Sequence, residues 1–283
     1  MTTESERELR PLEVVWRGFE PILRSLAVAM LSGFVAGAIA GGVGSRIAMR
    51  IVAITAGDAD QGAITDAEAT VGEITAGGTI FLIMFGGFIG VLGGVAYLGA
   101  RRWLADAGSW RGLAFGSLLL AMFGWVIIEG GNPDFERFGS RTLNIPMFAA
   151  LFVLFGLLLP PLFDRVERGL PRPSLQWPGV GSLPAYGLAA LFTLPMVGAI
   201  GSGFGEGDGT RRLFGTLLPA YALLALPVAA ALLAHANGGF ERLSELWERP
   251  LLLAAAVALL ALPVIAGVTL DANAVRDIYE ARG

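Results

Sequence analysis

The chain has 283 residues, 54% hydrophobic and only 16% charged, and its mean hydropathy of +0.66 indicates a polytopic membrane protein rather than a soluble domain. A net charge of −4, with basic residues standing singly or in pairs between apolar runs, excludes a nucleic-acid surface. The chain has no cysteine and no lysine, which excludes disulfides, thiolate metal sites, a lysine Schiff base and a lysine-dependent nucleotide loop.

Residues 1–24 begin with a charged stretch and are expected to form a juxtamembrane segment, a short helix lying against the membrane. Apolar runs of spanning length then follow at 25–45, 78–99, 112–128, 143–163, 183–201, 213–236 and 250–270. Residues 271–283 remain as a C-terminal tail. Because a backbone in lipid must satisfy its own hydrogen bonds, we predict an all-α membrane protein, a bundle of about seven transmembrane helices in one domain, 25–270.

The first run also allows a second interpretation. Ala38-Ile39-Ala40 has the small-x-small form of a signal-peptide cleavage site, but the apolar stretch is longer than a typical signal core. We therefore expect a retained first span, with a cleaved signal as the alternative.

Glycines recur at intervals of four in the first two spans and fall on one face of each helix. This expected helix-packing seam consists of Gly33, Gly37, Gly41, Gly86, Gly90 and Gly94. In lipid, close backbone approach at small residues is a main source of helix association, so the first two spans are expected to touch. The alternative is that glycine is simply more frequent in membrane helices.

Arg46 and Arg50 follow the first span and project away from the seam on an ideal helix. An arginine at the bilayer centre costs about 2.5–3.5 kcal/mol, so the hydrocarbon span is expected to end near Ser45. The two arginines could anchor at headgroups, pair with acidic loop residues or bind an anion. We expect a candidate outer polar cluster of Arg46, Arg50, Glu129 and Asp134.

The loops contain two patterns that resemble ligand sites only in part. The acidic loop 55–77 starts with Asp58-x-Asp60, but a calcium loop counted from Asp58 would need an acidic ligand where Ala69 stands. The glycine-rich stretch 201–209 follows a membrane helix and not a strand, unlike a phosphate-binding loop. We therefore predict no metal, no nucleotide and no cofactor.

Orientation follows from the arginine counts on the two sides of the predicted bundle. Twelve arginines lie on the side of the N-terminal segment and eight on the other. Cytoplasmic loops are enriched in basic residues, so the N-terminus is expected in the cytoplasm and the C-terminus outside.

Three motifs resemble a family of multi-pass membrane proteins of unknown function from high-GC bacteria. They are GSRIAMR after the glycine-rich first helix, Gly-Gly-Thr at 77–79, and NPDF at 132–135, within about residues 30–165. The resemblance implies the bacterial inner membrane. The family has no assigned activity, cofactor or catalytic residue, so none is carried over.

No catalytic grouping is recognisable in the sequence. We expect a non-catalytic accessory, scaffold or lipid-interacting protein, whose partners are membrane lipids and a protein within the membrane. The alternative is a small-solute transporter or channel with Arg46, Arg50 and Glu129 near its outer entrance. A weaker third hypothesis is an interfacial lipid enzyme using Asp58, Asp60 or Glu129, which would need a metal.

Overall fold

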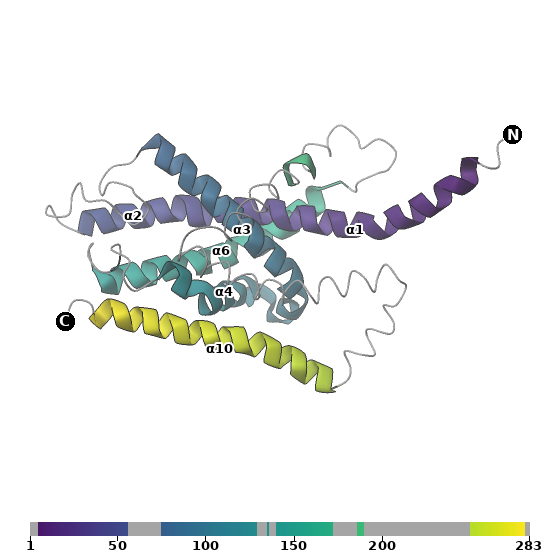
Figure 1. The fold of residues 1–283 in the computed structure, drawn as a ribbon. Coiled ribbons are helices and arrows are strands. Elements are labelled where there is room, and N and C mark those ends of the chain that lie inside the picture. The colour runs from purple at the N-terminus through teal and green to yellow at the C-terminus, as the bar shows by residue number, and fades with distance from the viewer. Residues whose placement is uncertain are drawn as a thin grey trace, which may run out of the picture.

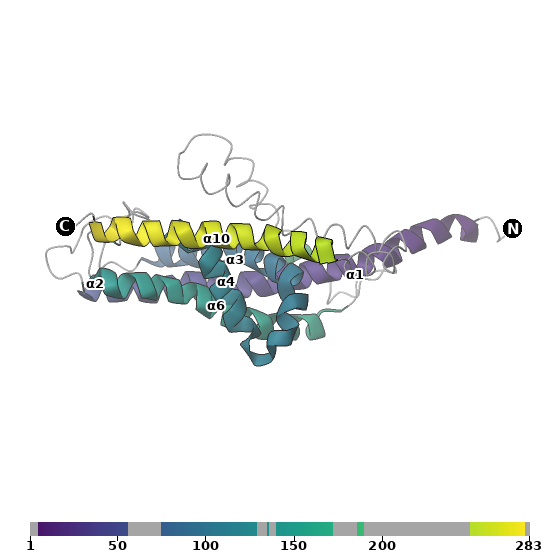
Figure 2. The same cartoon turned by 90° about the horizontal axis from the view of Figure 1, so that it is seen from below.

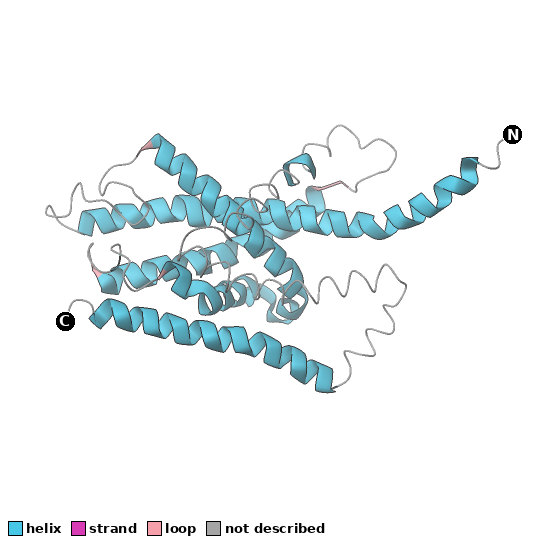
Figure 3. Cartoon of the chain, viewed as in Figure 1, coloured by secondary structure: helices cyan, strands magenta, loops and turns pink. Residues whose placement is uncertain are grey.

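The computed structural model describes residues 5–55, 75–128, 135, 140–171, 186–189 and 250–280. Within these ranges the chain is almost entirely helical and contains no strand, which confirms the all-α class (Figure 3). The expected span 213–236 and most of 183–201 lie outside the described residues. The acidic loop and the glycine-rich stretch 201–209 also lie outside them, apart from the loop's two ends.

The N-terminal helix is much longer than the expected span 25–45. Helix α1 (Ser5–Gly37) continues through a π-helical turn, η1 (Ala38–Val43), into α2 (Gly44–Thr55). Helix formation does not stop near Ser45 because α2 still has an apolar face to bury, with Ala48, Val52 and Ala53 packed inside.

The next two helices form a hairpin. Helix α3 (Ala76–Leu104) begins at Thr75, whose Oγ1 accepts a hydrogen bond from the amide of Gly78, 3.2 Å away. The 3₁₀ turn η3 (Ala105–Trp110) then connects α3 to α4 (Arg111–Ile127). Gly108 in this turn has φ of 53°, a left-handed conformation that glycine adopts without strain, and the chain reverses there.

Two further long helices follow, and a short helical stretch is described at 186–189. Helix α6 (Arg141–Gly169) stays continuous although it contains Pro146, Pro160 and Pro161. Helix α10 (Pro250–Glu280) runs past residue 270, where the sequence analysis places the start of a tail. Residues 268–280 include no proline or glycine, and Arg276 pairs with Glu280 one turn later at 2.6 Å, so the helix has no reason to end at 270.

Two ends of the bundle can be defined by their contacts. At the Arg24 end, Arg24, Arg101 and Arg111 meet the C-terminal part of α6. At the opposite, Ile278 end, apolar residues of α2, α4, α6 and α10 form one cluster that includes Ala48, Ile128, Phe148 and Ile278. Helix α10 therefore runs in the same direction as α1, and the two termini lie far apart at opposite ends (Figures 1 and 2).

Three described helical stretches are long and apolar enough to cross a membrane: Pro21–Thr55, Ala76–Ile127 and Thr142–Gly169. The middle stretch contains both α3 and α4 with the turn between them. These helices are those of a membrane-embedded protein. The total number of spans and their sidedness stay predictions.

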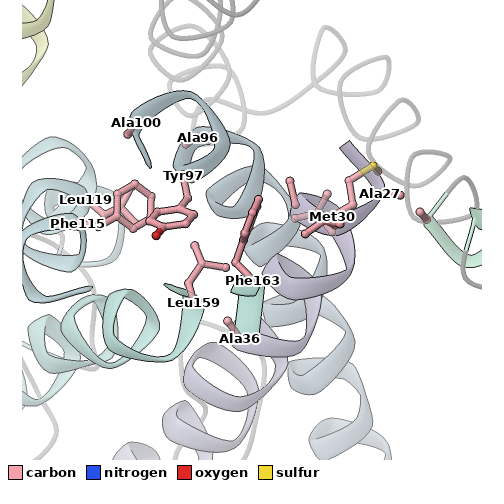
Figure 4. Close-up of a cluster of buried hydrophobic side chains, with 14 of the residues drawn as sticks. Ala27, Met30, Ala36, Ala96, Tyr97, Ala100, Phe115, Leu119, Leu159 and Phe163 are labelled. Atoms are coloured by element: carbon pink, nitrogen blue, oxygen red, sulfur yellow. The ribbon is translucent and has the colours of Figure 1, made fainter. Parts of the chain in front are cut away.

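The interior is filled by aromatic rings and small side chains (Figure 4). Tyr97 of α3, only 2% exposed, packs edge-to-face between Phe115 of α4 and Phe163 of α6, with ring centroids 5.2 and 5.4 Å away. The outer faces instead carry exposed large apolar side chains, including Val35, Ile39, Ile47, Ile80, Phe81, Phe85 and Ile89. Such outward apolar faces suit contact with lipid.

Candidate functional site

Helices α1 and η1 cross α3 with glycine against glycine, as the oblique crossing in Figure 1 indicates. The residues that meet there are Gly33, Gly37, Gly41, Gly86, Gly90 and Gly94. A methyl carbon built on Gly37 would lie 2.7 Å from the Cα of Gly90, and one built on Gly33 would lie 2.9 Å from the Cα of Gly94. At Gly33, Gly37, Gly86, Gly90 and Gly94 a methyl group would overlap backbone atoms, so the two backbones are in direct contact, and Gly41 is tight at 3.2 Å.

Two further close contacts were not singled out from the sequence. In α4 and α6, a methyl carbon on Gly112 would lie 2.8 Å from the carbonyl oxygen of Gly156, and one on Gly116 would lie 2.8 Å from the Cα of Val153. In α10, one on Gly267 would lie 2.7 Å from the Cα of Met122. The spacing of Gly112 and Gly116 is the same four-residue signal, and it was visible in the sequence.

Arg46 lies against the start of α3. Its Nη2 donates to the carbonyl oxygen of Thr75 at 3.5 Å, and a methyl carbon on Gly78 would lie 2.5 Å from the same nitrogen. The expectation that Arg46 points away from the second span is therefore wrong. The π-helical turn η1 accommodates about one extra residue, which rotates the following residues by roughly 100° and brings Arg46 round to α3.

The predicted outer polar cluster is described only in part. Glu129 and Asp134 lie outside the described residues, and Arg50 is exposed on α2. The Nε of Arg46 is buried and has no hydrogen-bond partner among the described residues. The pairing of these arginines with Glu129 or Asp134 stays a prediction.

A different ionic cluster, at the Arg24 end, was missed by the sequence analysis. Arg101 of α3 pairs with Glu167 of α6 at 3.0 Å, and Arg111 of α4 pairs with Asp164 of α6. Arg24 of α1 donates from Nε to the carbonyl oxygen of Leu170 at 3.1 Å. The sequence did contain one indication of this cluster. Asp164 and Glu167 are three residues apart, so they share a helix face, and they directly follow the fourth expected span. Arg24, Arg101 and Arg111 lie on the same predicted side of the membrane.

The cluster connects the middle of α1 with the end of α3, the start of α4 and the end of α6, and its two carboxylates balance the charges of Arg101 and Arg111. Arg24 and Arg168 donate to main-chain carbonyls in the last turns of α6, where a positive charge stabilises the helix dipole. Arg101 also lies over the ring of Phe163, 5.2 Å from its centroid. The paired side chains are 35–41% exposed, so each ion pair contributes at most about 1 kcal/mol, and its main effect is to set the relative position of the helices.

Asp271 of α10, just beyond the expected span 250–270, faces the end of α4. A methyl carbon on Gly124 would lie 2.9 Å from Oδ1 of Asp271, and that oxygen is buried without a hydrogen-bond partner among the described residues. Burial raises the pKa of Asp271 to about 6, although the backbone amide of Trp125 partly stabilises the charged form. The carboxyl therefore titrates close to neutral pH.

Within the described ranges, no three histidine or acidic side chains come close enough to hold a metal ion. Comparison with protein-family models, with curated proteins and with solved structures finds no match to this chain.

Proposed function

We propose that this chain is a multi-pass protein of the bacterial inner membrane that acts as a non-catalytic accessory or scaffold protein, through contacts with lipids and with a protein partner in the membrane. The observation that supports the proposal is that the described side chains of the bundle contact one another. Its helices pack through glycine backbones and interlocked aromatic rings, and its ion pairs join its own helix ends.

The proposal is supported by the structural roles of the aromatic and charged side chains. Tyr97, Phe115 and Phe163 fill the space between α3, α4 and α6. The carboxylates of Asp164 and Glu167 are engaged by arginines of α3 and α4. A bundle whose described ion pairs join its own helices and whose outer faces are apolar is suited to association with lipid and with another membrane protein.

We propose seven spans, with the N-terminus in the cytoplasm and the C-terminus outside. The parallel directions of α1 and α10 support an odd number of crossings, since the two helices start from the same end of the bundle. The excess of arginine at the Arg24 end supports a cytoplasmic location for that end.

The test is purification of the full chain in a mild detergent, followed by mass spectrometry of the proteins and lipids that remain bound. We expect a second membrane protein in stoichiometric amount. A matched preparation of an unrelated membrane protein of similar size controls for adventitious capture. Recovery of the chain with lipid alone would contradict the accessory role.

The alternative is a small-solute transporter or channel, and one observation favours it. The buried Nε of Arg46, with no hydrogen-bond partner among the described residues, could serve an anionic solute at the Ile278 end. Flux of small anions into proteoliposomes, lost in Arg46→Gln and retained in Arg276→Gln, would support transport. Equal flux through both variants would exclude a role for Arg46.

A further inference from the structure

Exposed arginine and tryptophan side chains surround the ionic cluster at the Arg24 end. We define them as the arginine–tryptophan rim: Arg102, Trp103, Trp110, Arg165 and Arg168. Trp103 is 46% exposed and Trp110 is 68% exposed, unusually high values for such large apolar rings. The rim therefore presents both positive charge and aromatic surface outward.

The ion pairs hold the rim together in space. Arg102 follows Arg101, and Arg168 follows Glu167, so both flank the pair that joins α3 to α6. In the same way, Trp110 precedes Arg111 and Arg165 follows Asp164, so both flank the pair that joins α4 to α6. Consecutive Cα atoms are only about 3.8 Å apart, which places these four rim residues beside the two ion pairs, and Trp103 follows Arg102 in the last turn of α3.

Among the side chains that the structure describes at the Arg24 end, the charge of the rim is not compensated. Asp164 and Glu167 neutralise the two inner arginines, Arg111 and Arg101, and leave the arginines of the rim as surplus positive charge next to Asp106. The Ile278 end is balanced among its described side chains, where the charged residues are Arg46, Arg50, Asp271, Arg276, Asp277 and Glu280. Among the described side chains, the positive surplus is therefore confined to the Arg24 end.

We propose that the arginine–tryptophan rim binds the phosphate headgroups of anionic phospholipids in the leaflet at the Arg24 end. A guanidinium group donates two parallel hydrogen bonds to phosphate oxygens, and a row of basic side chains beside a membrane attracts anionic lipid. Tryptophan rings at the headgroup level cover the first methylene groups of the acyl chains.

The aromatic half of the rim selects lipid over a soluble anion. Inorganic phosphate could use the guanidinium groups but would gain nothing from the exposed rings of Trp103 and Trp110. A phospholipid uses both. This inference rests only on the chain being embedded in a membrane, and it would survive failure of the accessory role.

The experiment uses the full chain, delipidated in a non-ionic detergent and titrated with phosphatidylglycerol or phosphatidylcholine of identical acyl chains. Bound lipid is counted by native mass spectrometry. We expect phosphatidylglycerol to bind about tenfold or more tightly. The double variant Arg102→Gln/Arg165→Gln should lose roughly tenfold of that affinity, because each basic residue beside a membrane contributes to attraction of anionic lipid.

Two controls separate this effect from general loss of charge or of folding. The double variant Arg50→Gln/Arg276→Gln removes the same charge from the Ile278 end and should change affinity less than twofold. The variant Arg102→Lys/Arg165→Lys keeps the charge and should keep most of the preference for phosphatidylglycerol. Both double glutamine variants should unfold at the temperature of the unmodified chain, since all four arginines are replaced at or near the surface.

Three outcomes would overturn the proposal. The first is equal binding of the two lipids by the unmodified chain. The second is an equal loss of affinity in the two glutamine variants, which would indicate net charge and not the rim. The third is displacement of phosphatidylglycerol by millimolar inorganic phosphate at constant ionic strength, which would indicate a site for a soluble anion.

Discussion

Gly37 leaves no space for a methyl group between α1 and α3, because the atoms facing it belong to the backbone of Gly86 and Gly90. Backbone atoms cannot rotate aside as a long side chain can, so any substitution must move a whole helix. The four-residue spacing of glycine predicted which residues would take part. How closely the two backbones approach depends on the angle and position at which the helices cross. The glycine spacing within one helix does not determine either.

Gly37→Ala should therefore destabilise the protein by about 1–3 kcal/mol, through overpacking at the crossing. Gly77→Ala is the matched control, since Gly77 opens the same α3 and has open space around it. The control should be neutral or slightly stabilising because alanine favours helix. Unfolding in detergent followed by circular dichroism measures both, and equal stability would contradict a tight crossing.

The pair of Arg111 and Asp164 should show measurable coupling. A double-mutant cycle with Arg111→Gln and Asp164→Asn is expected to give about 0.5–1 kcal/mol, because the pair is about one-third exposed. The control cycle with Arg276→Gln and Glu280→Gln, at 73% and 61% exposure, should give about 0.3 kcal/mol or less. Equal coupling in the two cycles would show that the ionic cluster does not hold the helices.

At the scale of elements, the π-helical turn η1 has the largest consequence. The residues before it follow the ideal helical phase, and those after it are rotated, which turns Arg46 toward α3. Periodicity alone could not foresee this, because a π turn is stabilised by what packs around it. Helix α10 makes a similar point, since its sequence does not encode that Gly267 and Asp271 are the residues that meet α4.

The docking of α10 on α4 should depend on pH through Asp271. Burial raises the pKa of Asp271 from 3.8 to about 6, so the folded protein binds the proton more tightly than the unfolded chain does. Protonation of Asp271 therefore adds to the free energy of unfolding. This contribution is fully present below pH 3.8 and is lost as the pH rises through about 6. Solvent screening at this partly exposed side chain keeps the difference to about 1 kcal/mol.

Asp271→Asn should therefore raise stability at pH 7.5, change it little at pH 4 and flatten the profile between them. The measurement is thermal unfolding in detergent across that range. Asp277→Asn, at an exposed position on the same helix, is the control and should keep the dependence on pH. A profile unchanged in Asp271→Asn would show that another group titrates.

At the scale of the whole molecule, the ends of the bundle are distinguished by charge and by contacts. The Arg24 end collects the N-terminal part of α1, the η3 turn and the end of α6, while the end of α10 lies at the Ile278 end (Figure 2). If the arginine excess marks the cytoplasmic side, the η3 turn and the end of α10 must face opposite compartments.

The chain's lack of cysteine makes this easy to test with single-cysteine variants. Asp106→Cys in η3 should react with a membrane-impermeant maleimide only after the membrane is opened. Glu280→Cys at the end of α10 should react in intact right-side-out vesicles. Labelling of both from the same side would contradict an odd number of crossings, and the reverse pattern would invert the orientation.

The sequence by itself determined that this chain is helical and embedded in a membrane, and it marked the glycines able to pack closely. Those properties are local, because a run of apolar residues in lipid must coil and small residues recur at helical spacing. Only the tertiary structure decided which charges meet, as with Arg101 and Glu167, sixty-six residues apart. It also decided where Arg46 points and which face of α10 packs on α4, because each depends on the surface of another helix.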